Sequence, residues 1–273
     1  MGAISSLFGY LLNALYTVFN NYGVAIIVFS IILRIILIPI TIKQQKSLKK
    51  SAALQEEMKE IQRKYKNNPE KLNQETIDLY KREKMSPFAG CFSSIIQLVI
   101  ILAVFWLVSQ PLTYMKRLDA SIINEYKTQL QQEGTNQTYA EIAIINRFGA
   151  EDERVRLNME FLGLDLSKVP SSNMNDWTVY IIPALYVISS IVSIKLTNSF
   201  NKKKKEQKKA ITDGKDLQVQ EEPNELEAME AMNKNMMYMM PLMSVFIAFI
   251  APLGLALYWF VSNVLMIVEK VII

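Results

Sequence analysis

Long apolar blocks alternate with segments crowded with charge along this chain. The clearest block, residues 24–42, reads VAIIVFSIILRIILIPITI. A helix of about 20 such residues is long enough to cross a hydrocarbon core of about 30 Å. Similar blocks recur toward the C-terminus, and charged residues are nearly absent inside them. The pattern predicts an all-α membrane protein with five transmembrane helices, at residues 23–43, 87–110, 177–197, 235–251 and 253–270.

The first 22 residues are also apolar, but asparagines interrupt their surface. Leu7, Leu11 and Leu15 recur at helical spacing, which predicts an interfacial amphipathic helix over residues 1–22 that lies on the membrane. The alternative is that this segment belongs to the first span itself. No lysine or arginine precedes the apolar run, so we expect no cleavable signal peptide.

Residues 44–86 are rich in charge, yet they carry a narrow apolar stripe. The stripe runs at a 4-3-4 spacing, stops at Asn67-Asn68-Pro69 and then resumes. Its members are Leu54, Met58, Ile61, Tyr65, Leu72, Thr76 and Leu79. This pattern predicts a helical hairpin whose two arms pair through the stripe. A solvated charged loop is the alternative, and the presence of the stripe in both arms disfavours it.

Lysines flank two of the predicted spans. They follow the first span at Lys43, Lys46, Lys49 and Lys50, and the third span from Lys202 onward. Because lysine and arginine collect in cytoplasmic loops, the hairpin and the charged loop 198–234 should be cytoplasmic. The loop 111–176, which is long enough for short helices, and the N-terminus are then outside. The C-terminus is then inside.

Histidine is absent from the chain, and Cys91 is the only cysteine. This composition excludes Ser-His-Asp and Cys-His catalysis, histidine metal sites and an internal disulfide. A phosphate-binding Gly-Lys loop is absent as well. We therefore expect a protein that is not an enzyme and that uses no cofactor and no metal.

Arg34 lies in the middle of the first predicted span, where a charge costs about 2.5 to 3.5 kcal/mol on insertion scales. No aspartate or glutamate lies well inside another predicted span, and Glu269 is near the far end of the fifth. We therefore expect Arg34 to face water or polar groups held by other helices. The alternative is that backbone carbonyls satisfy it. Intramembrane charges are usually functional, which favours the first interpretation.

Other polar side chains also lie inside the predicted spans. Ser30 is one turn before Arg34 and therefore on the same face. Gln97 is in the second span, and Ser262 and Asn263 are in the fifth. Each of them alone is more often a helix-packing residue. Taken with Arg34, they indicate a hydrated groove with apolar walls.

Two clusters admit two interpretations each. Methionines from Met229 to Met243 either accept varied apolar partners or simply fill a core. Six lysines between Lys202 and Lys209 either bind anionic lipid or ribosomal RNA, or only fix the topology. For the lysines, the interpretation that they only fix the topology is slightly favoured. For the methionines, the two interpretations are equally supported.

Five segments of the sequence together resemble the YidC/Oxa family of membrane protein insertases. They are LRIILIPITIKQQKSLKK, SPFAGCFSSIIQ, FLGLDLS, MMYMMPLM and PLGLALYWFVSN. The likeness covers most of the chain from about residue 22 onward, and the last segment and the arginine context are together highly specific. Residues around Cys91 depart from the commoner family pattern. The chain resembles the short forms of the family, since it shows no large extracytoplasmic domain.

The resemblance implies a five-helix bundle with a positively charged groove, open to the cytoplasm and to lipid and closed on the outside. Arg34 matches the groove arginine, and Ser30 and Trp259 match positions near the translocating chain. The expected set of substrate-contacting groove residues is Arg34, Ser30, Gln97, Trp259, Tyr258 and Asn263. The basic face of the hairpin is expected to recruit partners through Lys46, Lys49, Lys50, Arg63 and Lys64.

The implied partners are nascent membrane proteins and the phospholipid bilayer, with the ribosome and a Sec-type translocon as candidates and no DNA. The resemblance also implies a bacterial cell (plasma) membrane as the location. The competing interpretations are a small anion transporter or channel that uses Arg34 as an anion site, and an assembly scaffold without insertion activity. Transporters commonly contain two repeated halves, and no such repeat is visible here. A membrane-embedded hydrolase is least favoured, because no histidine and no intramembrane acid pair is present.

Overall fold

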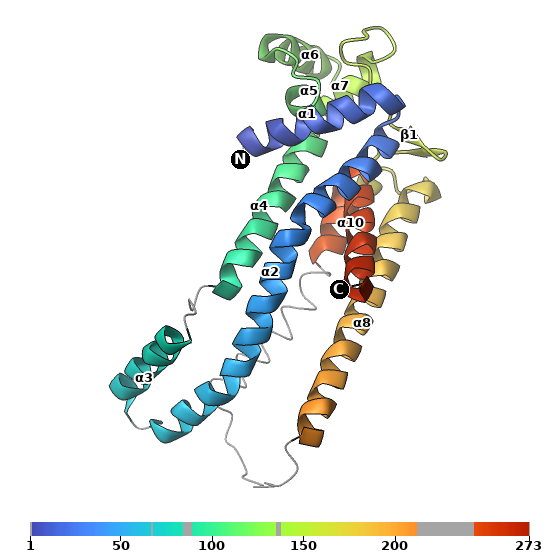
Figure 1. The fold of residues 1–273 in the computed structure, drawn as a ribbon. Helices are drawn as coiled ribbons and strands as arrows, with labels where there is room; N and C mark the ends of the chain where they lie inside the picture. Colours follow the sequence, from blue (N-terminus) through green and yellow to red (C-terminus); the bar gives the residue numbers. More distant parts are fainter. Residues whose placement is uncertain (1, 67, 84–88, 135–137, 212–242, 273) are drawn as a thin grey trace. The chain divides into compact units, whose positions relative to one another are not determined.

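The computed structural model describes residues 2–66, 68–83, 89–134, 138–211 and 243–272. Nearly all of its regular structure is helical, as the sequence predicts, and the chain is an all-α membrane protein (Figure 1). It divides into two compact units, Met1–Arg34 with Ala103–Ile273, and Ile35–Leu102. Each unit is described separately below.

Apolar helical stretches long enough to cross a membrane occur four times within the described part of the chain. These stretches are Gly2–Phe19, Tyr22–Lys46, Trp177–Thr197 and Leu253–Ile272, and a shorter one covers Ile95–Ser109. The first part of the predicted span 235–251, residues 235–242, lies outside the described residues. Only its residues 243–250 are described as a helix.

The N-terminal segment forms a helix of its own, α1 (Gly2–Phe19), and does not continue into α2 (Tyr22–Lys64). Asn20 between them has a φ of 46°, a left-handed conformation that helices of L-residues do not contain. Residues 1–22 therefore do not continue into α2 as one helix, and the position of α1 on the membrane surface stays a prediction. In contrast, α2 passes without a break through residue 43, where the predicted span ends and the predicted hairpin begins.

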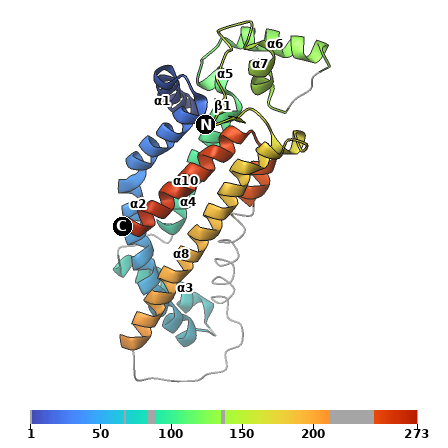
Figure 2. The ribbon, with the colours of Figure 1, turned by 90° about the vertical axis from the view of Figure 1, so that its right-hand side faces the viewer.

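The first unit contains the packed helices α8 (Ile181–Ile211) and α10 (Leu253–Ile272), which run side by side in both views (Figures 1 and 2). The unit also contains the start of α2 and the end of α4 (Ala89–Ser109). Its core includes aromatic side chains, since the Phe29 ring lies 5.6 Å from the ring of Phe8 and 6.4 Å from that of Tyr258. Burial of these rings fixes α1, α2 and α10 against one another.

Between α4 and α8 the chain forms short elements. They are α5 (Pro111–Tyr114), α6 (Ala120–Gln132), α7 (Ala140–Phe148), β1 (Glu160–Phe161), β2 (Leu164–Asp165) and the 3-10 helices η1 (Pro170–Ser172) and η2 (Trp177–Tyr180). The antiparallel β1–β2 hairpin was not predicted. Leu162 and Gly163 form its turn with φ values of 51° and 76°, the pair of positive angles that a two-residue type I′ turn requires.

The second unit is a helical hairpin made by the later part of α2 and by α3 (Pro69–Arg82). The Asn68 side chain accepts a hydrogen bond from the backbone nitrogen of Lys71 at 3.1 Å and caps α3. Leu54 and Leu79 are buried, as expected for members of the apolar stripe. An ion pair between Arg82 and Glu57 joins the two arms.

Candidate functional site

Arg34 forms an ion pair with Glu269, which joins α2 to α10. The arginine side chain is 18% exposed and the glutamate side chain is 6% exposed. This contact corrects the expectation that no acid in the spans pairs with Arg34. The two helices begin at the same end of the unit, and Glu269 lies only about one turn, or roughly 5 Å, deeper than Arg34. A long arginine side chain spans that difference, which positions counted along the sequence did not reveal.

Hydrogen bonding around this ion pair is incomplete. The closest contact runs from Arg34 Nη2 to one Glu269 oxygen, whereas the buried Arg34 Nε–H has no hydrogen-bond partner among the described residues. A buried ion pair offsets its desolvation cost only when good geometry and further hydrogen bonds support it. The contact therefore lacks the two parallel hydrogen bonds of a full arginine–carboxylate pair.

Three of the predicted groove residues are packed inside the unit. The Ser30 hydroxyl is buried and donates to the Ile26 carbonyl of its own helix at 2.7 Å. Tyr258 and Trp259 are also buried, and the Trp259 ring lies 6.2 Å from the ring of Tyr186 on α8. Their side chains are packed between helices and do not form an exposed surface.

Asn263 links α10 to α8. Its Nδ2 donates to the hydroxyls of Ser189 and Ser190, each at 3.0 Å. One heptad later on the same face of α10, the Lys270 amine donates to the Thr197 hydroxyl at 2.9 Å. These contacts match the helix-packing role that isolated polar residues often have in spans. They also leave a different face of α10 to carry Glu269 toward Arg34.

Gln97 lies on α4 within the second unit, and its side chain is exposed. Arg34 and Glu269 belong to the first unit. Of the predicted basic recruitment residues, Lys46, Lys50, Arg63 and Lys64 are exposed in the same unit, and the side chain of Lys49 lies outside the described part. Lys50 donates to the Glu83 backbone carbonyl, so it also braces the hairpin.

The segment 158–168 ties the starts of two spans together. The Tyr22 nitrogen of α2 donates to the Asn158 carbonyl at 2.9 Å. The nitrogens of Leu253 and Gly254 in α10 donate to the carbonyls of Lys168 and Leu166 at 2.9 and 3.0 Å. Helix starts have free N–H groups, and this segment satisfies three of them. It therefore covers one end of the first unit.

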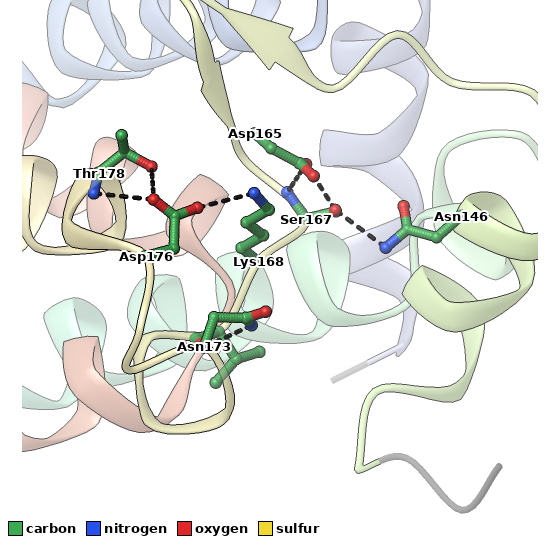
Figure 3. A network of polar contacts seen from close by, with 8 residues as sticks. Asn146, Asp165, Ser167, Lys168, Asn173, Asp176 and Thr178 are labelled. Atoms are coloured by element: carbon green, nitrogen blue, oxygen red, sulfur yellow. Dashed lines mark hydrogen bonds and ion pairs between the residues drawn. The ribbon is translucent and has the colours of Figure 1, made fainter.

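A polar network holds this covering segment in shape (Figure 3). Asp165 accepts from the nitrogen and the hydroxyl of Ser167, and that hydroxyl accepts from the Asn146 amide at 2.9 Å. The Lys168 amine donates to Asp176 at 2.8 Å, and Thr178 donates twice to the same carboxylate. The Lys168 contact and these hydrogen bonds lower the pKa of Asp176 to about 2.

Glu141 is a second buried carboxylate, located on α7 in the chain between the second and third predicted spans. It accepts from the backbone nitrogen of Thr113 at 3.0 Å and from the Thr113 hydroxyl at 2.5 Å. Burial raises the pKa of Glu141 despite these contacts. It lines a cavity of about 290 Å³ together with Lys127 and Ser109. Within the described residues no group of acidic, histidine and cysteine side chains is arranged to hold a metal ion.

Comparison with known proteins places this chain in a family. Residues 14–273 match the family model described as 60Kd inner membrane protein. A protein named Membrane protein insertase YidC from Treponema denticola is 29% identical over 264 residues, which cover 97% of this chain and 36% of the relative. Proteins of the same name from Caldanaerobacter subterraneus and Fusobacterium nucleatum are 40% identical over 105 residues and 41% identical over 96 residues. These matches cover 38% and 35% of this chain, and 51% and 47% of the relatives.

The chain thus spans between about a third and a half of the length of these relatives. The family match confirms the resemblance inferred from the sequence, and it agrees with the prediction that the chain is not an enzyme. The family match also agrees with the prediction that the chain is a multi-pass membrane protein.

Proposed function

The chain belongs to the 60Kd inner membrane protein family, and from this premise we propose that it inserts other membrane proteins into the bilayer and helps them fold. The observation that carries this proposal is Arg34, a cation inside an apolar span whose side chain keeps 18% of its surface exposed. An intramembrane charge is costly and marks a functional position by default. A cation there attracts the acidic residues of a hydrophilic segment that enters the membrane.

The covering segment 158–168 supports a groove that opens on one side only. Its backbone carbonyls accept hydrogen bonds from the helix starts of α2 and α10, which fastens it to that end of the unit. We propose that this end faces outside, with the N-terminus, and that the hairpin of α2 and α3 faces the cytoplasm. The lysines at residues 43–50 support this orientation through the positive-inside rule.

We propose the remaining arrangement from the same orientation: five spans, with α1 on the membrane surface. The exposed apolar side chains of α1, among them Leu7, Tyr10 and Val18, suit a helix that rests in the interface. The exposed basic residues of the hairpin, such as Lys46 and Arg63, then meet anionic headgroups, nascent chains or the ribosome. The six lysines from Lys202 belong to the described helix α8, but their side chains lie outside the description.

Energetically, the groove shortens the distance that a polar segment must cross in hydrocarbon. Once the segment has crossed, the following apolar helix moves into lipid, and burial of its apolar surface drives the step without a nucleotide. Arg34 contributes at the first stage, since an opposite charge within about 4 Å interacts by several kcal/mol at an effective dielectric constant of about 20.

Reconstitution into liposomes tests this function. Two single-span substrates, one with two aspartates and one with two asparagines in the translocated tail, are compared for protease protection. We expect the full chain to insert both and to favour the acidic one. We expect Arg34→Lys to keep much of that preference because it keeps the charge, and Arg34→Ala to lose it.

Protein level and chloride efflux are measured in the same liposomes. An equal insertion of the acidic substrate by the parent and by Arg34→Ala contradicts the electrostatic role. Chloride efflux without insertion would instead support the anion channel, and neither activity would support the scaffold.

A further inference from the structure

We propose that Glu269 is a resident counter-ion that competes with the acidic residues of an incoming segment for Arg34. The proposal rests on the insertase function argued above, and it adds a residue that sets which substrates engage the arginine. In the resting protein Glu269 occupies Arg34, and a substrate carboxylate must displace it. Glu269 would thereby act as a threshold for the acidity of the translocated segment.

The first observation in support is that the pairing is incomplete. Arg34 Nη2 contacts one Glu269 oxygen, and the buried Arg34 Nε–H donates no hydrogen bond to the described residues. A guanidinium binds a carboxylate best through two parallel hydrogen bonds. A substrate carboxylate that makes these bonds gains what Glu269 lacks, so exchange is favoured despite the resident charge.

The second observation is the difference in access between the partners. The Arg34 side chain is 18% exposed and the Glu269 side chain only 6%. A carboxylate that arrives from outside the pair therefore meets the arginine before the glutamate. Glu269 remains behind it, where it weakens the binding of a single incoming acid by like-charge repulsion.

The third observation is that α10 is anchored independently of the pair. Lys270, next to Glu269, donates to Thr197 of α8, and Asn263 donates to Ser189 and Ser190. Release of Arg34 consequently leaves α10 attached to α8. The pair can exchange partners without the loss of the surrounding helix packing.

The test uses the full chain in liposomes and three tails that carry no, one or two aspartates. We expect Glu269→Gln to raise insertion of the one-aspartate substrate by about two- to fivefold, the range that a partly exposed ion pair supports. Insertion of the neutral substrate should stay unchanged. Glu269→Asp keeps the charge on a shorter side chain and should give a smaller rise. Glu133→Gln removes an exposed carboxylate from a surface pair and serves as the control.

Unchanged or reduced insertion of the one-aspartate substrate by Glu269→Gln, at normal protein level, overturns the proposal. If Glu269→Gln fails to accumulate, the same comparison is made with Glu269→Asp, and no rise there overturns it equally. Failure of the underlying function looks different, because the parent would then show no preference for acidic tails. A parent preference that Arg34→Ala removes and Glu269→Gln leaves untouched refutes the competition alone.

Discussion

The two buried carboxylates among the described residues of the first unit have opposite surroundings. Glu141, outside the predicted spans, accepts two hydrogen bonds from Thr113 and belongs to a densely bonded region. Glu269, at membrane depth, contacts Arg34 through one of its oxygens, and the Arg34 Nε–H has no partner among the described residues. The first arrangement fixes a structure, whereas the second leaves binding capacity unfilled. The hydrogen-bonded region around Glu141 is thus a fixed structure, whereas the Arg34–Glu269 pair can exchange partners.

The largest expected effect comes from breaking the Arg34–Glu269 pair. Arg34→Ala leaves the Glu269 carboxylate buried without a counter-ion, and it should destabilise the protein by about 2 to 4 kcal/mol. The double change Arg34→Ala with Glu269→Gln removes both charges and should recover most of the loss. Thermal unfolding in detergent micelles measures both variants. Equal stability of the single and double variants would show that the pair is unimportant for the fold.

A change at the covering end comes next in size. The Cβ of an alanine at position 9 of α1 would lie 1.9 Å from the Tyr114 carbonyl oxygen of α5. The backbone would have to move to relieve this clash. Gly9→Ala should therefore cost about 1 to 3 kcal/mol. Gly2→Ala, on the same helix with open space around it, is the matched control. The prediction fails if the two variants unfold at the same temperature.

The smallest expected effect concerns the exposed Lys168–Asp176 pair. Because the folded-state pKa of Asp176 is about 2, below its ordinary value, its contribution to stability is present above about pH 4 and is lost as the pH falls toward 2. Asp176→Asn should unfold at a temperature that depends less on pH in this window. Unfolding scans of parent and variant between pH 5 and pH 2 provide the measurement, and parallel curves would contradict it.

The sequence was sufficient for the helical architecture because membrane helices leave a strong pattern. Apolar runs of the right length predicted the stretches at Tyr22–Lys46, Trp177–Thr197 and Leu253–Ile272. The 4-3-4 stripe predicted the hairpin, in which Leu54 and Leu79 are buried. Local signals sufficed in these cases, since each element is defined by its own residues.

The candidate site was less predictable because it depends on how helices meet. Glu269 was not expected to pair with Arg34 because it lies near the end of a predicted span, yet α10 brings it to Arg34. Asn263 was expected in the groove, and instead it bonds to serines of α8 that no pattern had singled out. The type I′ turn was also missed, because leucine at its first position is an unusual residue for a positive φ. The involvement of Glu269 could have been suspected from its charge alone, as the single acid within the last predicted span.

The most direct test of the account inverts the charge of the site. In the double variant Arg34→Glu with Glu269→Gln, the interior carries one negative charge where it carried a pair. Full chain in liposomes is given substrates that differ only in two aspartates or two lysines in the translocated tail. The account predicts that the ratio of acidic to basic insertion, which exceeds that of empty liposomes for the parent, falls below it for the double variant. A ratio that stays at the parent's value, at equal protein level, would contradict the claim that charge at position 34 selects the entering segment.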